Sequence, residues 1–217
     1  MKKSLIAVIA LGCMTSAAFA QSPDISLYTQ VGTEGVGLGV GTHLTDKLGA
    51  RAEINGFSMS RSVGIESNTY QAKAELKSAA GYFDLFPFEK SSFRLTTGVV
   101  FNDSSLHGNA TGSNVNINGT SYSVGAGESL NGRIKLASVA PYLGIGFGHE
   151  QQDKAGFSVF GDVGAYYANP KAELNATPGL ASAIGAANLA AEQAKLQSYA
   201  DRLKFYPVVK VGVAYRF

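Results

Sequence analysis

The segment that decides the fold reads Phe205-Tyr206-Pro207-Val208-Val209-Lys210-Val211-Gly212-Val213-Ala214-Tyr215-Arg216-Phe217. Every second residue, counted from Phe205 to Phe217, is apolar, whereas the residues between them include Lys210 and Arg216. A period of two indicates a β-strand, because successive side chains of a strand point to opposite faces. The segment therefore predicts a strand with one apolar face and one face that carries cations.

The last positions of this strand are aromatic: the chain ends on Phe217, and Tyr215 and Val213 precede it on the same face. This ending resembles the C-terminal strand of bacterial outer-membrane β-barrels. The resemblance implies that Val213, Tyr215 and Phe217 form the signal that the barrel-assembly machinery recognises. It also implies that the apolar face contacts lipid and that the cations point into the barrel. The final strand of a soluble sandwich is the alternative interpretation.

Residues 1–20 have the organisation of a secretory signal peptide. Lys2 and Lys3 form a short basic region, residues 5–11 form an apolar core, and Ala18-Phe19-Ala20 supplies a small-x-small pattern. We therefore predict cleavage before Gln21. The apolar core is too short to span a bilayer as a stable helix.

The only cysteine, Cys13, lies within this signal peptide. Lipoprotein processing at Cys13 is an alternative, which Ala10 disfavours because such sites usually carry leucine at that position. The mature chain is expected to hold no disulfide, thiol nucleophile or cysteine metal site. Its formal net charge falls from +2 to zero with the loss of Lys2 and Lys3. Nothing in this balance indicates binding to nucleic acid.

Residues 21–217 show strand-like alternation in eight segments, joined by alternately short and long connections, and contain no apolar run long enough for a transmembrane helix. We predict an all-β fold, an eight-stranded antiparallel transmembrane β-barrel. Gly35, Gly37, Gly39 and Gly41 share one face of the second segment, where they are expected to make room for large side chains opposite. The predicted strands span residues 25–31, 36–44, 48–59, 69–86, 93–102, 133–148, 157–168 and 205–217.

Three segments depart from simple alternation. Within residues 69–86 the apolar parity changes near Ser78, from which we predict a β-bulge. A polar loop is predicted over residues 60–68. Residues 103–132 are rich in Asn, Gly, Ser and Thr and form a long polar loop, either mobile or a pair of strands that rise beyond the membrane.

Residues 169–204 change to a helical period. Thr177-Pro178 is typical of an N-cap followed by proline in the first turn. Leu189, Leu196 and Leu203 recur every seven residues, with charged residues between them. We predict an amphipathic helix inserted in the last extracellular loop, which caps the barrel mouth or packs on the loops. A membrane-surface helix or a partner site are the alternatives.

The alternation of connections predicts the orientation of the barrel. Both termini are expected in the periplasm, with short turns near Asp46, Phe88 and Gln152. The long loops near residues 61, 114 and 188 are expected outside the cell, which is the usual arrangement. The interior of an eight-stranded barrel is just filled by side chains, so a free aqueous pore is not expected.

Charged residues on the predicted inner faces must pair in a narrow barrel, since an isolated buried charge costs about several kcal/mol or more. Four cations and three carboxylates nearly neutralise each other there, and His43 lies nearby. We predict a structural ion-pair network in the lumen, formed by Arg51, Glu53, Asp84, Arg94, Asp162, Lys210 and Arg216.

Short motifs along nearly the whole mature chain carry a wider resemblance: Gly35-Val-Gly-Leu-Gly39, Arg51 with Asn55-Gly56-Phe57, Asp84 with Phe86-Pro87-Phe88, Phe93-Arg94-Leu95, Ala140-Pro141-Tyr142-Leu143-Gly144, and Lys204-Phe205-Tyr206-Pro207-Val208-Val209. With these the chain resembles the small eight-stranded outer-membrane proteins, the group that includes OmpA-like and OmpX-like barrels. More closely it resembles a family of uncharacterised Gram-negative outer-membrane barrels. The resemblance implies fold and location, and it brings no activity.

We therefore expect an integral outer-membrane barrel without catalytic residues, cofactor or metal. Its role would be structural, or exercised through loops that contact lipopolysaccharide, other outer-membrane lipid, surface ligands or proteins. A lipid A-modifying enzyme is one alternative, for which only His107 lies on the outer side, in a floppy loop beside Asp103, Ser104 and Ser105. His43 and His149 are expected near the periplasm. A narrow channel or small-ligand-binding barrel is the other alternative.

Overall fold

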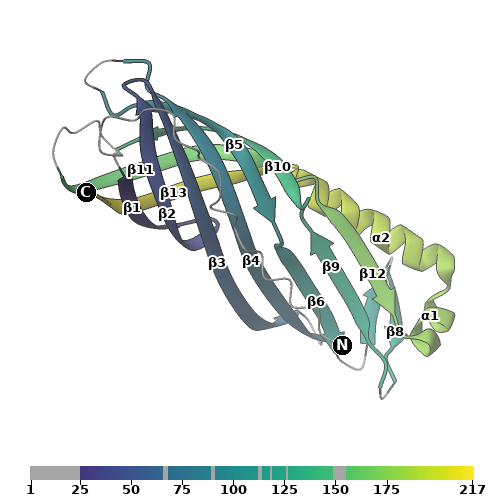
Figure 1. The fold of residues 1–217 in the computed structure, drawn as a ribbon. Helices are drawn as coiled ribbons and strands as arrows, with labels where there is room; N and C mark the ends of the chain where they lie inside the picture. The colour runs from purple at the N-terminus through teal and green to yellow at the C-terminus, as the bar shows by residue number, and fades with distance from the viewer. Residues whose placement is uncertain are drawn as a thin grey trace, which may run out of the picture.

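The structure is a computed structural model that describes residues 25–65, 68–88, 91–111, 114–117, 119–125, 127–148 and 155–217. The predicted signal peptide and its cleavage site lie outside these residues. Strands make up most of the described chain (Figure 1). They are β1 (Ile25–Gly32), β2 (Gly35–Thr45), β3 (Leu48–Ile65), β4 (Asn68–Leu85), β5 (Arg94–Asn102), β6 (Ser105–Thr111), β7 (Asn114–Ile117), β8 (Thr120–Ser123), β9 (Leu130–Lys135), β10 (Val139–Phe147), β11 (Gly156–Tyr167), β12 (Lys171–Ala176) and β13 (Phe205–Arg216).

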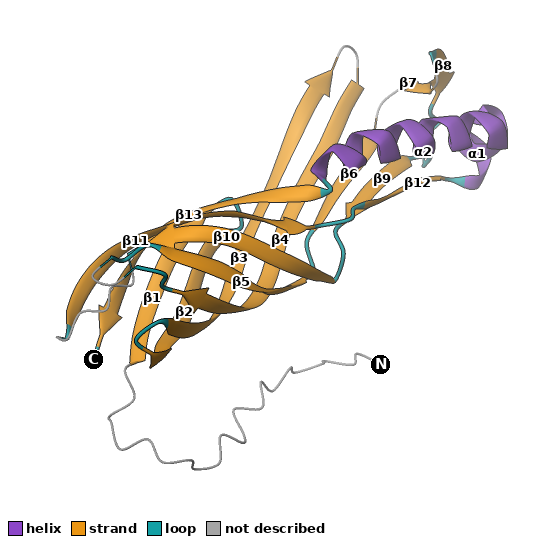
Figure 2. Ribbon diagram, turned by 90° about the horizontal axis from the view of Figure 1, so that it is seen from above, coloured by secondary structure: helices purple, strands orange, loops and turns teal. Residues whose placement is uncertain are grey.

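One antiparallel sheet holds eleven of the described strands, in the order β12-β9-β6-β4-β3-β2-β1-β13-β11-β10-β5. A further pairing of β4 with β5 closes the order from β4 to β5 into a ring, and β6, β9 and β12 stand outside that ring (Figures 1 and 2). The structure is therefore all-β with a large antiparallel sheet, consistent with a β-barrel, but a count of eight strands is not confirmed.

The larger count arises where the chain leaves the ring. Only Asp103 and Ser104 separate β5 from β6, and both strands pair with β4. Residues 136–138 separate β9 from β10, and residues 168–170 separate β11 from β12. At each of these three places the strand direction is interrupted between the ring and the part of the sheet beyond it. We call that part the extension: β6, β9, β12 and residues 68–77 of β4.

Alternating burial along the ring strands confirms the predicted period of two. In β10, every residue from Val139 to Phe147 switches between exposed and buried. In β13 the apolar residues Val209, Val211 and Val213 are exposed, whereas Val208, Lys210 and Ala214 are buried. The ring therefore has an apolar outer wall and a mixed, partly charged interior.

This outer wall is unusual for a protein surface in water. Leu143 is 71% exposed and Val159 is 75% exposed. Every other ring strand also has large apolar side chains that are exposed. Burying one such side chain is worth about 1.5–3 kcal/mol, so a wall of them favours an apolar surrounding medium by a large total.

Glycines in β2 make room for inner side chains, as the sequence predicts. A Cβ atom at Gly39 would overlap the ring of Tyr28, and one at Gly37 would overlap the amide of Asn55. Large side chains of the neighbouring strands fill the space that these glycines leave.

The predicted bulge near Ser78 is wrong. The pairing of β3 with β4 runs without a shift from Leu48 opposite Leu85 to Ile65 opposite Asn68. The apolar parity changes because the environment changes: the outer face carries Phe83 within the ring but Lys73 in the extension. The register shift that does occur lies between His43 and Thr45 of β2.

Two predicted loops contain more regular structure than expected. The predicted polar loop over residues 60–68 is wrong for most of its length, because β3 continues to Ile65 and β4 begins at Asn68. The segment 103–132 holds β6, β7, β8 and the start of β9. Of the two readings of that segment, strands beyond the barrel describe it better than a mobile loop.

The segment 169–204 begins with β12 and continues with the helices α1 (Pro178–Ile184) and α2 (Ala186–Ala200) and the 3-10 helix η1 (Asp201–Leu203). Thr177 is the N-cap and Pro178 begins the helix, as predicted. Gly185, with a φ of 81°, divides the predicted single helix in two. No helix in the described ranges has the length and apolar character needed to cross a membrane.

The helices pack on one face of the extension (Figure 2). A second apolar core, separate from the ring, joins Leu180 and Ile184 of α1 to Ala110 of β6 and Leu130 of β9. The Gln197 side chain of α2 accepts a hydrogen bond from the backbone N–H of Ala172 at 2.8 Å. The helical insertion therefore packs on the strands of the last two long connections.

Candidate functional site

Two arginines and two aspartates fill one level of the ring interior. Arg51 Nε lies 2.5 Å from Asp84 Oδ2, and Arg51 Nη1 lies 3.3 Å from Asp162 Oδ2. Arg94 Nη2 lies 2.5 Å from Asp162 Oδ1, and Arg94 Nε lies 3.5 Å from Asp84 Oδ1. Each arginine thus contacts both aspartates, and none of the four residues is more than 7% exposed. Four different strands contribute these side chains and are tied together by them.

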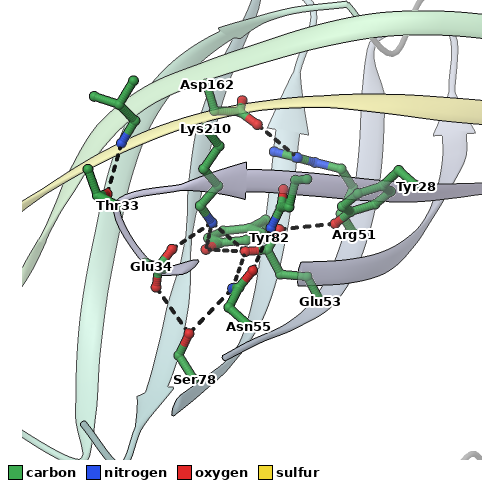
Figure 3. Close-up of polar contacts among 12 residues, drawn as sticks. Tyr28, Thr33, Glu34, Arg51, Glu53, Asn55, Ser78, Tyr82, Asp162 and Lys210 are labelled. Atoms are coloured by element: carbon green, nitrogen blue, oxygen red, sulfur yellow. Dashed lines mark hydrogen bonds and ion pairs between the residues drawn. The ribbon is translucent and has the colours of Figure 1, made fainter. Parts of the chain in front are cut away.

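A second level is centred on Lys210 (Figure 3). Its ammonium group donates to Glu53, lies 2.7 Å from Glu34 Oε2 and donates to the Tyr82 hydroxyl at 3.1 Å. Glu53 also accepts hydrogen bonds from Tyr28 at 3.2 Å and from Asn55 at 2.9 Å. The carboxylate of Glu53 therefore has charged and neutral donors, as a buried carboxylate requires.

Glu34 is a member of this level that the sequence patterns did not identify. It lies between β1 and β2, in a turn where side chains are usually exposed, yet it is only 5% exposed. Its carboxylate also accepts a hydrogen bond from Ser78 at 3.1 Å. The signal that could have found it was charge balance: the predicted set held four cations and three carboxylates, and Glu34 supplies the fourth carboxylate.

Six of the seven predicted network residues thus lie in these two levels. The seventh, Arg216, lies six positions along β13 from Lys210, opposite Ser26 of β1 and Gly156 of β11. At the same end of the strand the Tyr215 ring contacts the rings of Phe157 and Phe217, with centroids 4.8 Å and 5.0 Å apart. The role of Val213, Tyr215 and Phe217 in assembly remains a prediction.

Aromatic side chains close the ring interior on the side of the extension. The rings of Tyr82 and Tyr142 meet edge to face at 4.9 Å, and those of Tyr166 and Tyr206 stack at 5.0 Å. Asn102 donates a hydrogen bond to the Tyr166 hydroxyl at 3.0 Å. Paired charges and tyrosines therefore occupy the ring interior on this side.

The outer face of the extension is polar, in contrast to the outer wall of the ring. Lys73, His107, Arg133 and Glu173 occupy successive strands in one row of the sheet. A groove of about 580 Å³ lies over this row and the next. Its walls include Gln71, Lys73, His107, Asn131, Arg133 and Asn175. It is a candidate site for a polar, anionic ligand.

The expected position of His107 in a floppy loop is wrong, because His107 lies within β6. The Oγ atom of Ser105 lies 2.9 Å from Nε2 of His107, within hydrogen-bond distance. The ring of His43 contacts Phe86 with centroids 5.3 Å apart, and His149 lies outside the described residues. Across the described ranges, no three His, Cys, Asp or Glu side chains are grouped so as to hold a metal ion.

The chain is similar to two solved structures from Acinetobacter baumannii. One is CarO2, with 26% identity over 91% of this chain and 100% of that chain, and a TM-score of 0.62. The other is CarO, with 26% identity over 90% of this chain and 98% of that chain, and a TM-score of 0.60. No protein-family model and no curated protein matches the chain. Since these neighbours are outer-membrane proteins, the likeness supports an outer-membrane β-barrel here.

Proposed function

We propose that the chain is an eight-stranded barrel of the outer membrane whose interior is closed and whose extension acts at the cell surface. The observation that carries the proposal is the contrast between the two parts. The ring exposes an apolar wall and buries its charges, whereas the extension exposes charges and amides on the same outer face. A lipid layer around the ring and water around the extension satisfy both parts.

The connections support the orientation. The two long connections of the ring, residues 103–138 and 168–204, leave it at the end that carries the extension. The two-residue turn 46–47 after β2 lies at the opposite end, where the C-terminus also lies (Figure 1). In outer-membrane barrels short turns face the periplasm and long connections face outward. The extension is therefore the extracellular part in this proposal.

Labelling in intact cells tests this orientation. Asn175→Cys places a thiol at an exposed position on the outer face of the extension, and Lys47→Cys places one in the short turn after β2. A maleimide that cannot cross membranes is expected to label the first variant in intact cells and the second only after permeabilisation. Equal labelling of both, or no heat-modifiable migration of the protein in gels, would overturn the proposal.

A narrow channel is the less favoured function, because the buried ion pairs of Arg51 and Lys210 lie across the ring interior. Planar bilayers test it: the purified protein is expected to give no stepwise conductance. Reproducible steps that disappear on a substitution of Lys210 or Arg94 would instead assign transport to the lumen.

A lipid A-modifying enzyme gains one specific observation, the contact between Ser105 and His107 on the outer face. A serine hydroxyl at Nε2 of a histidine is the geometry of nucleophile and base. Within the described residues no carboxylate is hydrogen-bonded to this histidine, so the orienting group of a complete triad is lacking. Mass spectra of lipid A from cells that lack or overproduce the protein decide the point, with Ser105→Ala as the control.

A further inference from the structure

We propose that the outer face of the extension binds the phosphorylated headgroup of an outer-leaflet glycolipid, with phosphate on the row of Lys135 and Lys171 and sugar on the row of amides beyond it. The inference rests on the proposed function for the position of the membrane. It adds a ligand class and a site to that function.

Two lysines face each other on adjacent strands of this face. Lys135 of β9 is directly opposite Lys171 of β12, and both side chains are exposed. Like charges in direct cross-strand pairs destabilise a sheet, so this pair is expected to gain from an anion between them. A phosphate group, which offers several acceptor oxygens, can accept hydrogen bonds from both ammonium groups.

The carboxylate in the same row is occupied elsewhere. Glu75 lies two strands from Lys135, which is roughly 10 Å in a sheet, and its Oε1 atom is 2.8 Å from Lys73 Nζ. The hydrogen bond and charge of Lys73 lower the pKa of Glu75, in keeping with a formed pair. Among the described residues, neither Lys135 nor Lys171 forms an ion pair within 4 Å. In the next row Arg133 and His107 add donors, and Glu173 lies opposite Arg133.

The lysine pair lies at the depth of lipid headgroups. Val139 of β10 and Tyr167 of β11 are exposed apolar residues at the edge of the ring wall next to the extension. Val139 lies four positions along the chain from Lys135, and Tyr167 lies four positions from Lys171. Four residues of chain span at most roughly 14 Å, so each lysine lies within that distance of the apolar wall. Long lysine side chains can reach back toward the membrane from there.

Beyond the cations, four amide side chains form one row across four strands. The register places them side by side in the order Gln71, Asn109, Asn131 and Asn175. The Oδ1 atom of Asn109 is buried and has no hydrogen-bond partner among the described residues. Amides that both donate and accept suit the hydroxyl groups of a sugar, and the unsatisfied oxygen indicates that a donor is missing.

The sequence of surfaces therefore matches one kind of molecule. From the membrane outward, the face presents apolar side chains, then cations, then amides with a groove of about 580 Å³. A phosphorylated glycolipid has acyl chains, phosphates and sugars in the same order. A glycolipid of the surrounding leaflet can contact all three surfaces with one molecule, whereas a soluble polyanion or an acidic protein would contact only the cations and amides.

The test is retention of lipid by the purified, full-length protein in detergent, read by native mass spectrometry. The probes are bis-phosphorylated lipid A and the same lipid after removal of its phosphates. The double variant Lys135→Gln/Lys171→Gln is compared with Lys47→Gln/Lys195→Gln, which removes the same charge from exposed positions outside this face. Arg133→Gln serves as a second variant if the double variant does not fold, as judged by heat-modifiable migration.

We expect the double variant to bind lipid A about 30-fold more weakly than wild type. Each cation near a membrane surface raises the affinity about five- to sixfold, and the variant lacks two of them. The control variant is expected to bind lipid A as tightly as wild type. The dephosphorylated lipid is expected to bind equally to wild type and to the double variant. Equal retention of both lipids by wild type and double variant would overturn the proposal. Displacement of lipid A by the same concentration of free inorganic phosphate would also overturn it, because the site would then recognise phosphate alone. Heat-modifiable migration and surface labelling remain normal in those cases, so the proposed function would survive.

Discussion

Glu34 Oε2 lies 2.7 Å from Lys210 Nζ, although Glu34 belongs to the turn between β1 and β2 and Lys210 to the middle of β13. The turn sends its acidic side chain back into the ring instead of outward. This contact brings the number of carboxylates in the lumen to four, equal to the four predicted cations. The two levels thereby hold three cations and four carboxylates, and the fourth predicted cation, Arg216, lies six residues from Lys210 along β13.

Substitution of Glu34 tests this arrangement. Glu34→Gln removes a carboxylate from Lys210 but leaves Glu53, so we expect a loss of stability of about 1–3 kcal/mol. The measurement is urea unfolding in lipid vesicles. Because the chain has no tryptophan, unfolding is followed by heat-modifiable migration in gels. Glu173→Gln, an exposed position, is the control and should stay within about 0.5 kcal/mol of wild type. A Glu34→Gln variant as stable as that control would contradict the role of Glu34.

The arginine level predicts strong coupling between Arg94 and Asp162. Arg94→Ala leaves two aspartates with only Arg51, and breaking a buried ion pair in this way costs about 3–5 kcal/mol. The double variant Arg94→Ala/Asp162→Asn is expected to be less destabilised than the sum of its single changes. Unfolding midpoints of the four proteins measure the coupling. Additive effects would show that the two side chains do not act as a pair.

The inner glycines predict opposite effects of the same mutation on the two faces. Gly39→Ala would place a methyl group in the ring of Tyr28, and overpacking of this kind costs about 1–3 kcal/mol. Gly81→Ala meets nothing within 4 Å on the outer face of β4 and serves as the matched control. We expect Gly81→Ala to be neutral or stabilising. Equal stability of the two variants would refute the packing argument.

The C-terminal residues predict an effect on assembly rather than on stability. Deletion of Phe217 is expected to lower the amount of heat-modifiable protein in the outer-membrane fraction and to leave unfolded chain in the periplasm. Val209→Ala, an exposed apolar change earlier in β13, should affect the yield far less. Normal yield after the deletion would mean that Phe217 is not part of the assembly signal.

The apolar periodicity of the sequence was enough to predict most ring strands and the two faces of β13. It also predicted that Arg51, Glu53, Asp84, Arg94, Asp162 and Lys210 share the interior, because residues of like parity in neighbouring strands must face the same side. It failed at Ser78, where a change of surroundings was taken for a bulge. A parity rule assumes one environment along a strand, and β4 passes through two.

The sequence by itself determined the alternation of side chains, the positions of most ring strands, and the start of the helical segment at Thr177-Pro178, because these follow from neighbours along the chain. Only the tertiary structure decided that Glu34 turns inward, that β6, β9 and β12 extend the sheet, and that Lys135 faces Lys171. Each of these depends on contacts between residues far apart in sequence, whose register is set when the ring closes.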